Sequence, residues 1–119
     1  MVTHLRKSPR LNWPREVDKA LRDLRISLRH LYGTQAPSVL LYGSYARGEA
    51  EETSDVDVLL IYPAVVPSGH EINRLGTILA DLNLRYQVLI SVLPVSEQDY
   101  HNSTGIFWSN IRQEGVLLG

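Results

Sequence analysis

Apolar residues recur at helical spacing in the first third of the chain. Between Pro14 and Gly33 they fall three or four residues apart, at Val17, Leu21, Leu24, Leu28 and Leu31. This spacing aligns the apolar side chains in one stripe along a helix, with charged residues on the remaining surface. Proline is favoured in the first turn of a helix, and glycine is favoured just after its last turn. The pattern predicts one amphipathic helix between Pro14 and Gly33.

A second helical stripe is predicted within residues 68–83. Its apolar positions are Ile72, Leu75, Ile78, Leu79 and Leu82. Ser68 precedes Glu71 by three residues, which is the pattern of a capping box. We therefore expect Ser68 to begin this helix.

Three runs rich in apolar and β-branched residues predict strands at 38–42, 55–62 and 86–95. The run 55–62 is apolar on both faces beyond its first residues, so we expect it to be central. A short helix is expected just after Ser44. Residues 96–115 predict one or two short helices, with Ser96 and Asp99 as a capping pair, and residues 116–118 predict a small edge strand.

The order of these elements predicts an α/β (α+β) fold in which helices cover a small mixed β-sheet. A length of 119 residues suits a single domain, 1–119. The chain has no cysteine, and its first residues lack the apolar stretch of a signal peptide. We therefore expect a cytoplasmic protein that does not enter a membrane.

Charge is distributed unevenly along the chain. Residues 1–30 have a formal charge of +5, and residues 31–119 have a formal charge of −6. A basic segment can bind nucleic acid, but no aromatic residues alternate with these basic ones and no recognition motif accompanies them. We therefore interpret the basic residues as a solvated helix face and do not expect direct nucleic-acid binding.

The predicted central strand begins with two acidic residues on one face. Side chains alternate across a strand, so Asp55 and Asp57 point to the same side, roughly 6–7 Å apart along it. Two carboxylates this close oppose each other's ionisation, and burial adds to the cost. A divalent cation between them removes this cost, and carboxylate oxygens are ligands that Mg²⁺ prefers.

A Gly-Ser pair lies at the end of the preceding strand. Gly43 has no β-carbon, so a ligand can approach the backbone closely at this position. Ser44 offers a hydroxyl and a backbone N–H, and a helix beginning nearby favours an anion. This pair and the acidic strand together fit a metal-bound triphosphate.

Residues 43–60, GSYARGEAEETSDVDVLL, resemble the signature of the minimal nucleotidyltransferases. These are stand-alone members of the DNA polymerase beta superfamily. Their pattern is Gly-Ser, a short helix with Ala-Arg-Gly, a variable loop, and Ser-Asp-x-Asp before apolar residues. The later string Asn-Ile-x-x-Glu-Gly-Val, residues 110–116, is similar to members of the same group.

The resemblance implies a nucleotidyltransferase-like fold and an enzyme that transfers AMP from ATP to a hydroxyl and releases pyrophosphate. It implies that Asp55 and Asp57 are catalytic residues that bind Mg²⁺, and that Gly43 and Ser44 bind the nucleotide. Arg47 has two interpretations. It contacts phosphate, or it pairs with an acidic neighbour, namely Glu49, Glu51 or Glu52.

The sequence departs from the family pattern at one position. Active members carry a third carboxylate on the next strand, and here Ser91, or alternatively Gln87, stands at that place. Neither side chain can replace a carboxylate as a base. The missing ligand is then supplied by water or a partner, or the domain is a nucleotide-binding remnant.

The resemblance also suggests a partner. Minimal nucleotidyltransferases are often antitoxins that modify a tyrosine of a HEPN ribonuclease toxin. The string Arg25, His30 and Tyr32 resembles the HEPN nuclease motif, but we interpret it as an ordinary helix surface because the chain cannot form the helical bundle of a HEPN domain. The alternative function is a catalytically impaired pseudoenzyme that neutralises its partner by binding. Transfer to a small molecule such as an aminoglycoside is a third, less favoured possibility.

Overall fold

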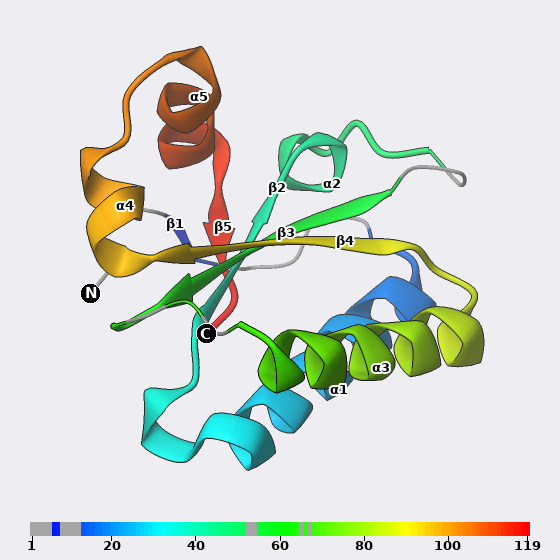
Figure 1. Cartoon of the computed structure of the whole chain (residues 1–119). Coiled ribbons are helices and arrows are strands. Elements are labelled where there is room, and N and C mark those ends of the chain that lie inside the picture. Colours follow the sequence, from blue (N-terminus) through cyan, green and yellow to red (C-terminus); the bar gives the residue numbers. More distant parts are fainter. Residues whose placement is uncertain (1–5, 8–12, 52–54, 65, 67) are drawn as a thin grey trace.

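The computed structural model describes residues 6–7, 13–51, 55–64, 66 and 68–119. Helices and strands alternate along most of the chain (Figure 1). The helices are α1 (Arg15–Tyr32), α2 (Ser44–Arg47), α3 (His70–Tyr86), α4 (Glu97–Asn102) and α5 (Ile106–Glu114), with a 3₁₀ turn, η1 (Gly33–Gln35), after α1. The strands are β1 (Arg6–Lys7), β2 (Ser38–Tyr42), β3 (Val56–Tyr62), β4 (Ile90–Ser96) and β5 (Val116–Leu117).

The described strands form one mixed sheet in the order β1-β5-β2-β3-β4. β3 pairs antiparallel with β2 and parallel with β4, which confirms the predicted mixed sheet and the central position of residues 55–62. The short strand predicted at the end of the chain is present as β5, but its predicted edge position is wrong. β5 lies between β1 and β2, because its two residues pair with both neighbours.

Helices cover both faces of the sheet, with α1 and α3 side by side on one face and α4 and α5 on the other (Figure 1). The alternation of β3 explains this division. Val58 and Leu60 pack with the buried side chains of α1, whereas Leu59 and Ile61 pack with Tyr100 of α4 and its neighbours. Within the described ranges, no helix is both long enough and apolar enough to cross a membrane.

The helix ends agree with the sequence at two places and differ at a third. Pro14 precedes α1 and Gly33 ends it with a φ of 60°, as predicted. Ser96 caps α4 by accepting a hydrogen bond from the Asp99 backbone N–H at 3.0 Å. The capping box at Ser68 is wrong, because α3 begins at His70 and Gly69, with a φ of 62°, takes the cap position without a side-chain hydrogen bond.

The boundary between α3 and β4 also lies later than predicted. The helix continues to Tyr86, and the strand begins at Ile90. Asn83 explains the difference: its backbone carbonyl accepts from the Val88 N–H at 3.2 Å, and its side-chain Oδ1 accepts from the Ile90 N–H at 2.9 Å. These bonds fix the connection as a turn, and the first contact with β3 is the Leu89 carbonyl, which accepts from the Val56 N–H at 2.8 Å.

A substitution of Gly115 tests how tightly the end of α5 packs against the sheet. A β-carbon at Gly115 would lie 2.6 Å from the Ile111 carbonyl oxygen and 2.8 Å from Leu40 Cδ2. We expect Gly115→Ala to lower the free energy of unfolding by about 1–3 kcal/mol, as overpacking does. Urea denaturation followed by circular dichroism measures this change.

Gly76, within α3, is the matched control, because nothing lies within 4 Å of a β-carbon placed there. Gly76→Ala should raise the free energy of unfolding by about 0.5–1 kcal/mol, since alanine is the better helix former. Equal stability of the two variants would contradict the tight contact at Gly115.

Candidate functional site

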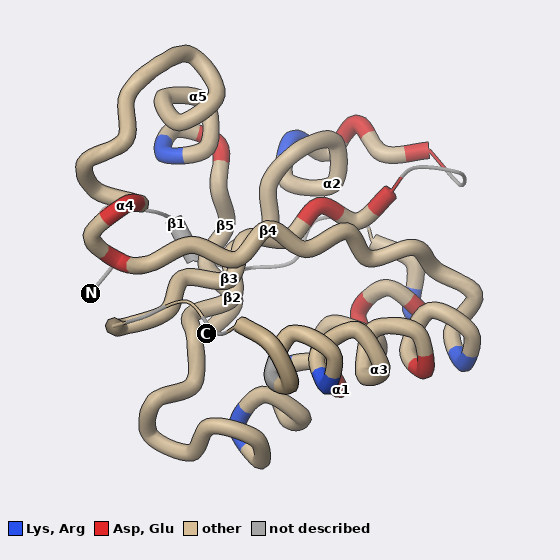
Figure 2. Tube along the Cα trace, in the orientation of Figure 1, with Lys and Arg blue, Asp and Glu red and all other residues tan. Residues whose placement is uncertain are grey.

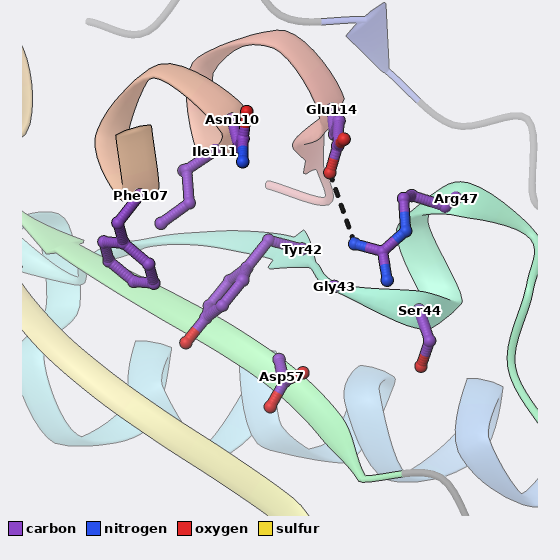
Figure 3. Close-up of a pocket in the computed structure, with 9 residues that line it drawn as sticks. All are labelled: Tyr42, Gly43, Ser44, Arg47, Asp57, Phe107, Asn110, Ile111 and Glu114. Atoms are coloured by element: carbon purple, nitrogen blue, oxygen red, sulfur yellow. Dashed lines mark hydrogen bonds and ion pairs between the residues drawn. The ribbon is translucent and has the colours of Figure 1, made fainter. Parts of the chain in front are cut away.

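A cavity of about 500 Å³ lies where β2, β3, α2 and α5 meet (Figure 3). One part of its wall is polar and the other part is aromatic and apolar. The residues that line it are Tyr42, Gly43, Ser44, Arg47, Asp57, Phe107, Asn110, Ile111 and Glu114. Its size is that of an ordinary small-molecule site.

Three of the four residues singled out in the sequence line this cavity. Gly43 follows β2, Ser44 is the first residue of α2, and Asp57 is the second residue of β3. The pairing of β2 with β3 places Tyr42 directly opposite Asp57, so the residues that follow Tyr42 turn beside the carboxylate. The fourth residue, Asp55, is exposed and precedes β3. It is not part of the cavity wall.

Gly43 lies against the Asp57 carboxylate. Its φ of 77° falls in the region that favours glycine, and a β-carbon there would lie 2.4 Å from Asp57 Oδ2. Backbone geometry and contact therefore both require glycine at this position. The Gly-Ser turn and the acidic strand predicted separately from the sequence are in direct contact.

The Asp57 carboxyl group is in an unfavourable environment for its charge. Partial burial and the nearby Asp55 charge raise the pKa of Asp57, and Arg47 acts in the opposite direction more weakly. Asp57 also raises the pKa of the Tyr42 hydroxyl, in addition to the effect of burial. Figure 2 shows acidic positions along the segment from α2 to the start of β3. A cation bound here would relieve this crowding of negative charge.

Asp55 and Asp57 are the residues that could hold such a cation. In the part of the chain that the structure describes, no group of three or more His, Cys, Asp or Glu side chains could form a metal site alone. Mg²⁺ is commonly bound by one or two carboxylates together with substrate phosphates. A cation held by these two aspartates would therefore need further oxygen ligands from outside the described residues.

The next strand provides a serine beside Asp57. Ser91 of β4 is the register partner of Asp57. Adjacent register partners point to the same face of a sheet, so Ser91 is the neighbour of Asp57 on this face. Gln87, the other expected position, follows the last residue of α3 and is outside the strand.

Arg47 has acidic partners on two sides. Its Nε donates to Glu49 Oε1 at 2.9 Å, and its Nη1 donates to Glu114 Oε2 at 3.3 Å (Figure 3). The contact with Glu49 confirms the interpretation that Arg47 pairs with an acidic neighbour. Glu52, another expected partner, is outside the described residues, as is Ser54 of the Ser-Asp-x-Asp pattern.

The α5 residues of the cavity wall were not assigned to the site from the sequence. Phe107, Asn110, Ile111 and Glu114 follow one another at spacings of three, one and three residues, which places them on one helix face. That spacing was the available signal, together with the Asn-Ile-x-x-Glu string. Phe107 also contacts Tyr42 edge-on, with ring centroids 5.9 Å apart.

A mixed sheet with a Gly-Ser turn packed against an acidic strand defines the class of the nucleotidyltransferase-like proteins. The model of the nucleotidyltransferase domain family matches residues 21–108. The chain belongs to this family.

Two relatives come from Methanocaldococcus jannaschii. The chain is similar to the protein named "Putative protein adenylyltransferase MJ0604", with 29% identity over 104 residues, 85% of this chain and 96% of the relative. It is also similar to "Putative protein adenylyltransferase MJ0141", with 32% identity over 76 residues, 64% of this chain and 76% of the relative.

Solved structures share the fold. A chain of the structure described as "the toxin-antitoxin with AMP-PNP" superposes with a TM-score of 0.56 at 16% identity, covering 82% of this chain and 71% of that one. A mutant of the toxin-antitoxin MntA-HpeT gives a TM-score of 0.57 at 14% identity, covering 89% of this chain and 73% of that one. The nucleotidyltransferase fold expected from the sequence is thus confirmed.

Substitution of Gly43 tests the contact with Asp57. Gly43→Ala should cost more stability than Gly33→Ala, which also has a positive φ but has nothing within 4 Å of the added β-carbon. The backbone cost shared by both variants is about 1–2 kcal/mol, and we expect Gly43→Ala to exceed it. Urea denaturation compares the two free energies of unfolding.

The extra loss of stability of Gly43→Ala over Gly33→Ala should shrink in an Asp57→Ala background. The nearest clashing atom, Oδ2 of Asp57, is then absent. An unchanged difference between the two glycine variants in that background would show that the contact is not its cause.

The charge of Asp57 should reduce stability in the absence of a cation. Because its pKa is raised in the fold, the folded state binds the carboxyl proton more tightly than the unfolded chain does. Asp57→Asn should therefore raise the Tm at pH 7 in EDTA. The gain should disappear as the pH falls through the raised pKa, where the wild-type carboxyl is also neutral.

Asp81→Asn is the control, because Asp81 is an exposed carboxylate that pairs with Arg85. This variant should show no gain in Tm at pH 7. A Tm for Asp57→Asn at or below the wild-type value in EDTA would overturn the electrostatic account of the site.

Proposed function

We propose that the protein is a Mg²⁺-dependent adenylyltransferase that transfers AMP from ATP to a hydroxyl of a partner protein. The observation on which the proposal depends is the contact between Gly43 and Asp57, which joins a turn suited to phosphate to a carboxylate suited to metal. Relatives named as protein adenylyltransferases support the reaction, and one of them is covered over 96% of its length.

Gly43 and Ser44 would bind the triphosphate. Both residues line the cavity: the Asp57 carboxylate fills the space where a Gly43 side chain would lie, and Ser44 adds a hydroxyl and a backbone N–H. The hydroxyl and the N–H can donate hydrogen bonds to phosphate oxygens. They would hold the leaving pyrophosphate in place while the acceptor oxygen attacks the α-phosphorus.

Asp55 and Asp57 would hold Mg²⁺ together with phosphate oxygens of the nucleotide. The ion would neutralise the charge that develops as the bond between the α-phosphorus and pyrophosphate breaks. Raised proton affinity at Asp57 is consistent with a carboxylate that gains from a bound cation. The proton of the acceptor hydroxyl would pass to water or to a group of the partner, since Ser91 cannot accept it as a carboxylate would.

The acceptor would be a tyrosine of a HEPN-type toxin, which would make this protein an antitoxin. Two solved structures that share the fold are toxin-antitoxin complexes, and one was crystallised with AMP-PNP. Their identity to this chain is 14–16%, so they support the toxin partner by analogy alone.

Ser91 favours a second candidate function. With serine next to Asp57 in the sheet, the domain would bind nucleotide without transferring it efficiently and would neutralise its partner by contact. Both functions use the same cavity, but only the first requires the aspartates for its effect on the partner.

Incubation with labelled ATP, Mg²⁺ and the protein encoded by the neighbouring gene distinguishes the two functions. We expect label on the partner with the wild type and with Ser91→Ala, and a loss of at least a hundredfold with Asp57→Ala, because the metal ligand is removed. Mass spectrometry of the partner identifies the modified hydroxyl.

The matching assay for binding alone is neutralisation of the partner's toxicity. Neutralisation that persists in the double variant Asp55→Ala/Asp57→Ala, with no label transferred by the wild type, would reject the adenylyltransferase and support the pseudoenzyme.

A further inference from the structure

Arg47 is the basic residue of the cavity. Among the described residues that line it, Arg47 alone has a positive charge, whereas Asp57 and Glu114 are acidic. The guanidinium lies beside Gly43 and Ser44 and points toward the cavity (Figure 3). A polyanion that enters next to the Gly-Ser turn has this group as its nearest cationic partner.

The two acidic partners of Arg47 are not equivalent. Glu49 binds Nε, is 65% exposed and does not line the cavity. Glu114 binds Nη1, is 35% exposed and is part of the cavity wall. Glu49 therefore holds the guanidinium from the solvent side, and Glu114 holds it from the cavity wall.

Glu114 reaches this position from a distant part of the chain. It is the last residue of α5, 67 residues after Arg47, and β5 follows directly and pairs with β2. The tight packing of Gly115 against Ile111 and Leu40 fixes the end of the helix. The sheet therefore fixes the backbone at Glu114, from which the carboxylate reaches Arg47.

We propose that Glu114 takes the place of a phosphate group on Arg47 when the nucleotide site is empty, and that nucleotide and pyrophosphate bind by displacing it. The inference rests on the proposed function, because it assumes that phosphates occupy this cavity. Glu114 is then a positioning residue that acts through Arg47. It lowers the affinity for polyphosphate and favours the release of pyrophosphate after transfer.

Removal of the Glu114 charge tests the exchange. Isothermal titration calorimetry measures the affinity for two ligands in the presence of Mg²⁺: pyrophosphate and α,β-methylene-ATP, whose α–β bridge cannot be cleaved. Glu114→Gln should bind each ligand about two- to fivefold more tightly than the wild type does. This range corresponds to the strength of a partly exposed ion pair. In an Arg47→Gln background, Glu114→Gln should have no effect.

Glu49→Gln is the matched control. It removes one negative charge from the same guanidinium but leaves the cavity wall unchanged, so it measures the general effect of charge on binding. The proposal requires a larger gain for Glu114→Gln than for Glu49→Gln. Equal gains, or a gain that persists without Arg47, would show simple repulsion and overturn it, as would weaker binding by Glu114→Gln.

A crystal structure, read together with the calorimetry, distinguishes failure of this inference from failure of the proposed function. A crystal structure of the wild type with Mg²⁺ and α,β-methylene-ATP should show Arg47 Nη1 on a phosphate oxygen and separated from Glu114. Persistence of the ion pair in that complex would overturn the inference while leaving the nucleotide site intact. Absence of binding to the wild type and to every variant would instead overturn the proposed function, and this inference with it.

Discussion

The close approach of Gly43 to Asp57 is the constraint on which the site depends. The antiparallel register of β2 and β3 puts Tyr42 opposite Asp57, and the chain must then turn within one residue of a carboxylate. Only glycine permits both the φ of 77° and the space for Asp57 Oδ2. A β-carbon at position 43 would collide with Asp57 Oδ2, so the turn and the acidic strand could not keep this contact.

The alternation of β3 explains why a central strand can begin with charged residues. Val58 and Leu60 complete the core with α1 and α3, so that face is fully apolar. The opposite face is apolar only from Leu59 onward, where Tyr100 and its neighbours cover it. Asp57 lies just beyond that cover. The strand is therefore held on both faces by its later residues, and its first residues are available for chemistry at the cost of a raised pKa for Asp57.

Features with a local cause could be predicted from the sequence. The stripe of α1, the capping of α4 by Ser96 and the composition of β3 each depend on nearby residues, and each was found where expected. The motif also indicated that the Gly-Ser turn and Asp57 lie close together, because β2 and β3, which carry them, are consecutive antiparallel strands. The predicted start of α3 was wrong because Gly69 adopts a positive φ and takes the cap position, which a capping-box pattern does not indicate.

Features that depend on distant parts of the chain could not be predicted. The position of β5 inside the sheet requires β1, which lies more than a hundred residues earlier. The approach of α5 to the cavity follows from that position, because β5 pairs with β2 and thereby places the end of the helix beside α2. No local pattern shows that Glu114 meets Arg47, although both residues were visible in the two strings that resemble the family.

The charges that line the cavity affect which ligands it would accept. Of the charged residues that line the cavity, two are acidic and one is basic, and the basic one is already paired. A triphosphate alone would bring several more negative charges into this surrounding, where Coulomb repulsion is less screened than in bulk water. Under the proposed function, a divalent cation held by Asp57 and the nearby Asp55 would reverse that balance, and release of Glu114 from Arg47 would free a positive charge for the phosphates. The same acidic groups that make the empty site unfavourable would thus favour a metal-bound nucleotide over a free one.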